Sequence, residues 1–198
     1  MRVEVVASDL SRVEGADAIV SPTNTGFSED GWLASLLMKR GGERVRAALR
    51  EQDPLPLGGV VETTAGDLPA RYLLHAAVVG LRAEDLTGER ERGTLTSAKV
   101  LYDATVNALE TASSLGCETV AVPLLGGGLA MYPERPCADV MVRALRDYRR
   151  GFPDSAVKVV WLVGRMENEL DALEAALDAA PELRAARDDS PNATALPT

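Results

Sequence analysis

The sequence predicts an α/β domain: a mixed, mostly parallel central sheet with helices on both faces, in three layers. Short apolar segments alternate along the chain with amphipathic ones, and most of the apolar segments are continuous hydrophobic runs. Strands of that kind are buried on both sides, which in α/β folds places a layer of helices against each face of the sheet. The 198 residues, 46% of them hydrophobic, suit one domain with its own core.

Six segments have the composition of strands, because β-branched and aliphatic residues dominate them. They are 2–7, 16–20, 59–66, 71–79, 117–122 and 156–163. We expect the second strand to stop before Pro22, because proline has no N–H to donate to a sheet ladder. The short link Asp67–Ala70 between the third and fourth strands favours an antiparallel pair.

Five segments have apolar residues at helical spacing or lie between residues that begin and end helices. They are 32–40, 43–51, 94–115, 134–148 and 167–179. Gly41-Gly42 is expected to end the first helix and Gly116 the third, and either Thr94 or Thr96 to cap the third. The charged stretch 81–93 is expected to be a mobile loop, or a flap over a site.

The chain is expected to divide into a folded domain, residues 1–180, and a disordered acidic tail, residues 181–198. From Pro181 the composition turns to alanine, arginine, aspartate, serine, proline and threonine, which do not supply a packed core. Disorder is expected to begin at about Ala185.

Composition limits the partners that we expect. The net charge is −9 and the isoelectric point about 4.7, so nucleic acids and anionic membranes, which need a basic surface, are not expected to bind. No apolar run approaches the roughly 18 residues of a membrane span. A small anion held by backbone N–H groups is compatible with this charge.

The reactive side chains are few. One histidine, His75, and two cysteines, Cys117 and Cys137, have no metal-ligand spacing, so we predict no metal site, and we predict no cofactor. His75 lies in a strongly apolar strand, which favours a core histidine over a general base. The cysteines are expected to be small core residues. Two thiols and no recognisable signal peptide predict a cytoplasmic location.

A glycine loop, Gly126–Gly128, is the first place to look for a ligand. It follows the apolar strand 117–122 and precedes the helix 134–148. Residues without Cβ let a ligand approach the backbone N–H groups, and a helix N-terminus adds its dipole, so the arrangement favours an anion. A tight strand-to-helix connection without a ligand is the alternative. The loop is no P-loop, because neither Lys-Ser nor Lys-Thr follows it.

Four segments taken together carry a resemblance to a known family. They are Val6–Leu10, Asp17–Asn24, Leu68–His75 and Val122–Pro133. In this order and spacing they resemble the macro domain family, which binds ADP-ribose. The resemblance covers about residues 2–179. It implies the family's three-layer α/β/α fold and a binding module for ADP-ribose or an ADP-ribosylated protein.

The resemblance also implies a set of ligand-binding residues. They are Asp9, Leu10, Asn24, Gly31, Trp32, Leu33, Gly126, Gly127, Gly128, Leu129 and Ala130. Asp9 would accept a hydrogen bond from the adenine amino group, with the backbone of Leu10 beside it, and Asn24 would bind a hydroxyl of the distal ribose. The glycine loop with the two residues after it would wrap the pyrophosphate, and Gly31–Leu33 would form the opposing loop.

Three of these residues have a local alternative. Asp9 can cap N–H groups of its own turn, and Asn24 can form an Asx turn. Trp32 can pack against its helix instead of covering a ligand, since tryptophan serves in both roles.

Other positions depart from the family pattern and bear on catalysis. Without a gap, Glu29 and Asp30 fall in the family's four-glycine run, where carboxylates would oppose a diphosphate. Ala34 stands where hydrolysing members have an aspartate, Ser21 where they have an asparagine, and Ala130 where an aromatic residue stacks. No catalytic residue is therefore assigned. A binding module is the first hypothesis; the alternatives are an ADP-ribosyl hydrolase of atypical mechanism and a degenerate macro domain that acts through a protein partner.

Overall fold

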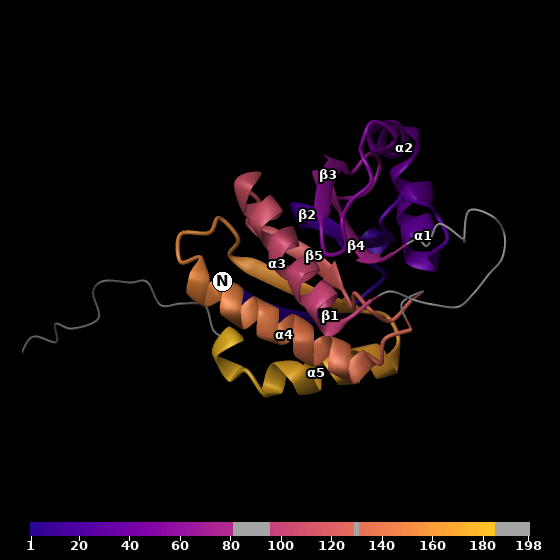
Figure 1. The fold of residues 1–198 in the computed structure, drawn as a ribbon. Helices are drawn as coiled ribbons and strands as arrows, with labels where there is room; N and C mark the ends of the chain where they lie inside the picture. Colours follow the sequence, from indigo (N-terminus) through magenta and orange to yellow (C-terminus); the bar gives the residue numbers. More distant parts are fainter. Residues whose placement is uncertain (81–95, 129–130, 185–198) are drawn as a thin grey trace, which may run out of the picture.

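The computed structural model describes residues 1–80, 96–128 and 131–184. Its strands are β1 (Arg2–Ala7), β2 (Ala18–Asn24), β3 (Val60–Thr64), β4 (Tyr72–Val79), β5 (Thr119–Pro123) and β6 (Val159–Gly164). They form one sheet in the order β1-β6-β5-β2-β4-β3 (Figure 1). All neighbours are parallel except β3, which is antiparallel to β4 at one edge. The predicted mixed, mostly parallel sheet and the antiparallel pair are confirmed.

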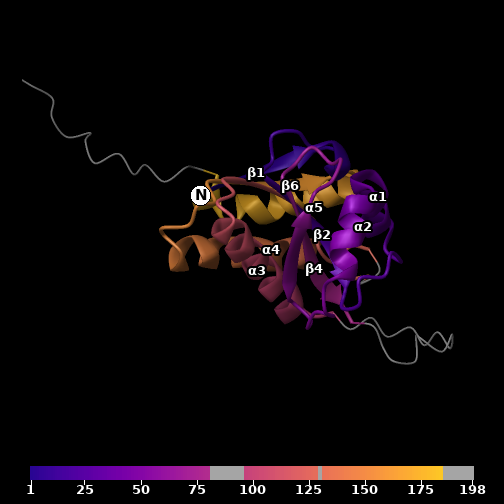
Figure 2. The same ribbon diagram turned by 90° about the horizontal axis from the view of Figure 1, so that it is seen from above.

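Helices cover both faces of this sheet. They are α1 (Trp32–Gly41), α2 (Glu43–Arg50), α3 (Ala98–Ser114), α4 (Glu134–Gly151) and α5 (Glu167–Asp178), with short 3-10 helices η1 (Leu10–Arg12) and η3 (Pro181–Leu183). The helices α1 and α2 pack on one face, and α3, α4 and α5 on the other. Figure 1 shows α1 and α2 at the upper right and α4 and α5 below, and Figure 2 shows the same arrangement from above. The predicted α/β fold with helices on both faces is confirmed.

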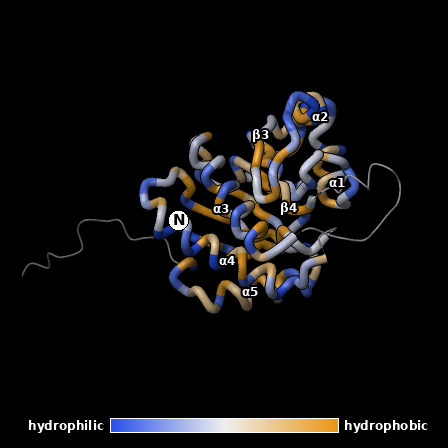
Figure 3. The backbone as a smooth tube through the Cα atoms, in the orientation of Figure 1, coloured by the Kyte–Doolittle hydropathy of each residue, from blue (hydrophilic) through white to orange (hydrophobic). Residues whose placement is uncertain are grey.

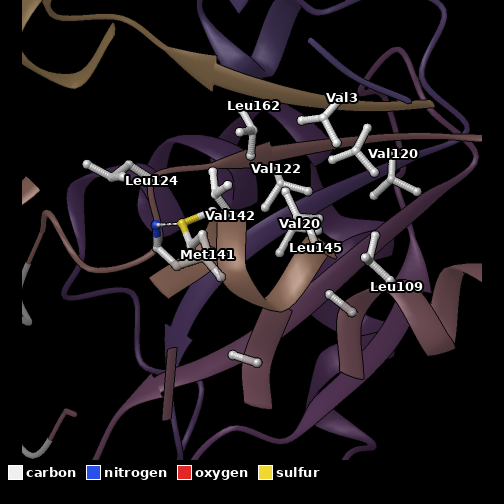
Figure 4. Packing of buried hydrophobic residues seen from close by; sticks show 14 of the residues in the cluster. Val3, Val20, Leu109, Val120, Val122, Leu124, Met141, Val142, Leu145 and Leu162 are labelled. Carbon is white, nitrogen blue, oxygen red and sulfur yellow. Dashed lines mark hydrogen bonds between the residues drawn. The ribbon is translucent and has the colours of Figure 1, made fainter. Parts of the chain in front are cut away.

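Successive residues of β2 show why the strands are continuous apolar runs. Ile19 belongs to the cluster with Leu37 of α1, whereas its neighbour Val20 belongs to the cluster with Leu109 of α3 and Leu145 of α4. Because side chains alternate between the faces of a strand, both faces of a covered strand must be apolar. Hydrophobic segments are accordingly prominent in the central strands and hydrophilic ones in α2 (Figure 3). Figure 4 shows part of the cluster that contains Val20, Leu109 and Leu145, in which side chains of strands and helices pack together.

The prediction that the second strand stops before Pro22 is wrong. β2 continues to Asn24, and Pro22 lies opposite Ala76 of β4. Beyond Ile19, β2 is no longer paired with β5. This end of β2 is therefore hydrogen-bonded on one side only, where a residue without an N–H can be accommodated. The separation of β2 from β5 also leaves room between the ends of the two strands.

The start of α3 differs from the expectation as well. Ser97 is its N-cap, and its hydroxyl accepts a hydrogen bond from the backbone N–H of Val100 at 3.2 Å. A serine at this position satisfies one of the unpaired N–H groups of the first turn. Thr96 is thus not the cap, and Thr94 and the predicted loop 81–93 lie outside the described residues.

The folded chain continues past α5. Leu183 of η3 is buried in the core beside Leu177 of α5, so the packed part of the chain reaches this residue. The predicted tail from about Ala185 onward lies outside the described residues. No described helix combines the length and the apolar composition that crossing a membrane requires.

Candidate functional site

A cleft of about 210 Å³ lies at the carboxyl ends of the five parallel strands, the usual ligand site of open α/β sheets. Each strand contributes residues at or just after its end. The lining residues are Ser8, Asp9, Leu10, Pro22, Thr23, Asn24, Ser28, Gly31, Trp32, Leu33, Ala34, Val78, Val79, Pro123, Leu124, Leu125, Gly127, Gly128, Val163, Arg165 and Glu169. Most of the predicted site residues thus come together. Gly126 does not line the cleft, and Leu129 and Ala130 lie outside the described residues.

Asp9 enters the cleft from the end of β1 and is held by its own turn. It is the N-cap of η1, and its Oδ1 accepts hydrogen bonds from the N–H of Ser11 at 3.0 Å and from the Ser11 hydroxyl at 2.6 Å. Its Oδ2 lies 3.7 Å from Arg12 Nε and 3.8 Å from Arg40 Nη2. The Ser11 hydroxyl is the largest influence that lowers the pKa of Asp9 below 3.8, although burial opposes it. Asp9 is therefore charged at neutral pH, and Oδ2 keeps room for a further donor.

Asn24 ends β2, and its amide is used by the loop that follows, residues 25–31 (the β2–α1 loop). Its Oδ1 accepts hydrogen bonds from the N–H of Gly26 and the N–H of Ser28, both at 3.1 Å. Its Nδ2 donates to the Ser28 carbonyl at 3.2 Å and to the Ser28 hydroxyl. The Asx turn, the local alternative for this residue, is therefore what the structure contains. Asn24 lines the cleft and at the same time fixes the loop beside it.

The two carboxylates that replace glycines in this loop do not line the cleft. Glu29 is turned toward α2, where its two oxygens accept hydrogen bonds from Arg46 at 3.0 and 3.3 Å. Asp30 accepts a hydrogen bond from the Ser28 hydroxyl at 2.6 Å. Their charges are thus directed to the protein's own groups and away from the space that a ligand would occupy.

The N-terminus of α1 forms the same wall of the cleft. Gly31 is its N-cap and has no side chain to satisfy the first N–H groups, and Trp32, Leu33 and Ala34 of the first turn all line the cleft. N–H groups without a capping side chain, together with the helix dipole, attract an anion. Trp32 is 59% exposed, so at this position the tryptophan is not a core residue.

The three residues of the glycine loop have different surroundings. A Cβ on Gly126 would lie 3.0 Å from Cys137 Sγ and 3.0 Å from Tyr132 Cβ, so this glycine is required for packing. A Cβ on Gly127 would meet only Leu124, at 3.6 Å, and one on Gly128 would meet nothing within 4 Å. Gly127 and Gly128 therefore present open backbone to the cleft.

Two sulfur atoms, Met141 Sδ and Cys137 Sγ, pack against the start of this loop. The N–H of Leu125 donates to Met141 Sδ at 3.4 Å, the dashed contact of Figure 4. Cys137 is a free, buried thiol, and burial raises its pKa to about 11. A weak sulfur acceptor suits a buried N–H at the start of a turn that has no stronger partner.

Two charged residues of the cleft, Arg165 and Glu169, are not among the residues predicted from the sequence. Both follow β6, and the signal that could have found them is the rule applied to the other strands: polar residues just past a carboxyl end. Glu169 caps α5, because its Oε2 accepts hydrogen bonds from the N–H of Arg165 at 2.9 Å and the N–H of Met166 at 3.0 Å. The guanidinium of Arg165 lies over the ring of Trp32, 4.4 Å from its centroid.

His75 lies in the core beneath the β2–α1 loop and does not line the cleft. Its Nε2 is 2.9 Å from Thr63 Oγ1, and its ring meets the edge of Phe27 with a centroid distance of 6.4 Å. Burial lowers its pKa from 6.5 to about 4, so it is neutral at physiological pH. Within the described ranges, no three His, Cys, Asp or Glu side chains gather as metal ligands.

Five strand ends, an uncapped helix N-terminus and open glycine backbone define an α/β domain whose cleft suits an anion. The particular family follows from comparison with known proteins. The chain belongs to the macro domain family, because the family model described as Macro domain matches residues 20–141. The resemblance drawn from the four segments is thereby confirmed.

Two relatives by sequence are uncharacterized proteins. The chain is 35% identical to uncharacterized protein Rv1899c of Mycobacterium tuberculosis over 180 residues, which are 91% of this chain and 45% of that protein. The chain thus spans about half the length of this mycobacterial relative. An uncharacterized protein of Sulfurisphaera tokodaii is 32% identical over 156 residues, 77% of this chain and 79% of that protein.

Solved macrodomains share the fold. The Oceanobacillus iheyensis macrodomain with ADP superposes with a TM-score of 0.74 and 19% identity, over 91% of this chain and 92% of that one. The Trypanosoma brucei macrodomain in complex with ADP superposes with a TM-score of 0.72 and 20% identity, over 89% of this chain and 69% of that one. At such low identities the likeness concerns the fold alone.

Proposed function

We propose that the protein is a binding module for ADP-ribose, either free or attached to a protein, and that the ligand lies in the cleft at the strand ends. One observation carries the proposal: the uncapped N-terminus of α1 and the open backbone of Gly127 and Gly128 line the same cleft. This protein is acidic and has no broad basic surface, but backbone N–H groups can bind a diphosphate without one. That macrodomains of the same fold have been solved with ADP supports the choice of nucleotide.

Asp9 is the group that selects adenine in this proposal. Its Oδ1 is occupied by Ser11, whereas its Oδ2 has only the long ion pairs with Arg12 and Arg40. An ionised carboxylate only accepts hydrogen bonds, so Oδ2 recognises an amino group on the edge of a base. The turn fixes Oδ1, and the orientation of Oδ2 follows from it.

Binding is favoured over hydrolysis by the lining of the cleft. Ala34 lines it where hydrolysing members of the family have an acid. The carboxylates among the described lining residues are Asp9 and Glu169, and each accepts hydrogen bonds from backbone N–H groups nearby. A general base must have a free acceptor beside the reacting water. In this proposal the free oxygen of Asp9, Oδ2, faces the adenine amino group and not the distal ribose, and Glu169 caps α5, so neither carboxylate serves as that base.

Calorimetry of the protein with ADP-ribose, ADP, AMP and NAD tests the proposal. ADP-ribose is expected to bind, and Asp9→Ala is expected to weaken binding by about 1–3 kcal/mol, the usual cost of losing a hydrogen bond to a charged group. Asp139→Ala is the matched control, because Asp139 pairs with Arg135 on the surface of α4 and does not line the cleft.

The alternatives give different results in the same experiment. A wild-type protein that binds none of these nucleotides would be a degenerate macro domain, and the proposal would be wrong. Release of ADP-ribose from a mono-ADP-ribosylated protein, in an assay run beside the calorimetry, would make the protein a hydrolase.

A further inference from the structure

Arg165 is the only cation among the described residues that line the cleft. The chain has a net charge of −9, and the other charged lining residues are the carboxylates Asp9 and Glu169. Backbone N–H groups and a helix N-terminus carry only partial positive charge. The guanidinium of Arg165 is therefore the one full positive charge that the described lining residues offer to an anion.

The guanidinium of Arg165 stacks on the ring of Trp32, which comes from another loop of the cleft. Arg165 follows β6 and Trp32 follows β2, and β5 lies between these two strands in the sheet. The stacked pair, with 4.4 Å between the guanidinium carbon and the ring centroid, therefore joins the two loops on either side of the end of β5. Gly127 and Gly128 come from that end of β5. The Trp32–Arg165 pair thus lines the same cleft as this open backbone, at the carboxyl ends of the strands.

No described residue neutralises the charge of Arg165. Its guanidinium forms no ion pair with a described residue, and its contact is to the face of an aromatic ring. Glu169, the cleft carboxylate that is nearest to Arg165 in sequence, is used as the cap of α5. Asp9 is engaged by Ser11. A guanidinium on a ring face keeps its N–H groups at the ring edge, where the planar fork can bind phosphate oxygens.

We propose that Arg165, positioned by Trp32, is the counter-charge for the diphosphate of the bound nucleotide, and that it makes the cleft select ligands by their phosphate charge. The inference rests on the proposed function and adds to it a residue for which the four resembling segments give no role. Adenosine and ADP share the base and the ribose, so the proposal predicts that they respond differently to the loss of this one charge.

The test compares affinities for ADP-ribose, ADP and adenosine, measured by calorimetry for wild type and Arg165→Gln. The variant is expected to lose about ten-fold or more in affinity for ADP-ribose and ADP, and less than about two-fold for adenosine. The salt dependence of ADP binding is expected to become shallower, since an ion pair is screened by salt. Arg143→Gln is the matched control, because Arg143 stacks on Tyr102 at 5.1 Å away from the cleft, and it should leave all three affinities unchanged.

A second variant tests the positioning role of Trp32. Trp32→Leu is expected to lower ADP affinity less than Arg165→Gln does, and the double variant is expected to be no worse than Arg165→Gln alone. Additive losses would show that the two residues act separately, and the positioning role would be wrong.

The outcomes also separate this inference from the proposed function. Equal losses for adenosine and ADP would place Arg165 against the base and overturn the inference, as would unchanged affinities. In both cases the wild type still binds ADP-ribose, so the proposed function stands. A wild type that binds none of the three ligands would overturn both.

Discussion

The β2–α1 loop satisfies its polar groups with its own side chains, whereas the glycine loop on the other side of the cleft presents backbone from which side chains are missing. In the first loop Asn24 binds the N–H groups of Gly26 and Ser28. In the glycine loop a Cβ on Gly127 or Gly128 would meet almost nothing. One wall is therefore shaped by internal hydrogen bonds as far as the uncapped N-terminus of α1, and the other by the absence of side chains.

This difference indicates where substitutions should act. In a loop that is closed by its own side chains, a substitution removes hydrogen bonds within the fold and lowers stability. In open backbone, an added side chain costs the fold little but occupies the ligand's space. Substitutions in the β2–α1 loop should therefore lower mainly stability, and substitutions in the glycine loop should lower mainly ligand affinity. The following experiments test this difference.

The largest effect is expected at Gly127. Gly127→Val should abolish ADP-ribose binding and leave the thermal midpoint nearly unchanged, because the new Cβ would meet only Leu124, at 3.6 Å, inside the protein. Calorimetry and a melting curve check the two parts. Gly151→Val, at the end of α4 with nothing within 4 Å of its Cβ position, is the control and should bind normally. Loss of the fold in Gly127→Val would show that this wall is structural too.

Acid should lower the free energy of unfolding through His75, which packs against Phe27 of the β2–α1 loop. Burial lowers its pKa from 6.5 to about 4. Between these pH values His75 is protonated in the unfolded chain but remains neutral in the folded one. The stability that His75 provides is complete above about pH 6.5 and is lost toward pH 4, by a total on the order of 3 kcal/mol.

Urea unfolding at several pH values measures this loss, with His75→Gln as the reference that lacks the titrating group. The free energy of unfolding of wild type should fall more steeply than that of the variant between pH 6.5 and 4. Parallel curves would mean that His75 is protonated in the fold without penalty.

A smaller effect is expected at Asn24. Asn24→Ala leaves the N–H groups of Gly26 and Ser28 without their acceptor and should cost about 1–3 kcal/mol of stability. Asn24→Asp keeps the acceptor oxygens and should cost less. If Asn24→Ala instead lowered ADP-ribose affinity at unchanged stability, Asn24 would bind the ribose, and the two walls would be more alike than their hydrogen bonds indicate.

The smallest effect is expected from the pair that turns Glu29 away from the cleft. Arg46→Gln removes the partner of Glu29, and a freed carboxylate near the diphosphate should lower ADP-ribose affinity by about two- to five-fold. Adding Glu29→Gln should restore the affinity, which titration calorimetry can measure. No restoration would mean that Arg46 acts on the ligand by another route.

The position of the cleft could be predicted from the sequence because it depends on topology. Apolar runs that alternate with helices give a mostly parallel sheet, and the carboxyl ends of its strands meet at one edge. Asp9, Asn24 and Gly127 each follow or end such a strand, so their meeting required no knowledge of side-chain contacts. The same argument, applied to β6, would also have included Arg165.

The roles of individual side chains could not be predicted in this way. Whether the amide of Asn24 faces a ligand or its own loop depends on rotamers and on the position of Ser28, which no spacing encodes. Gly126 and Gly127 are identical and adjacent in the sequence, yet Cys137 and Tyr132 crowd only the first of them. Differences of this kind arise from packing between elements that are distant along the chain.

The buried thiol of Cys137 makes the glycine loop open to chemical measurement. It lies directly under Gly126, and with a pKa of about 11 it holds almost no thiolate at neutral pH. An alkylating reagent such as iodoacetamide therefore modifies Cys137 only in molecules whose loop has lifted from the core. The rate of labelling reports how often this wall opens, and a nucleotide that binds against the loop should slow the reaction.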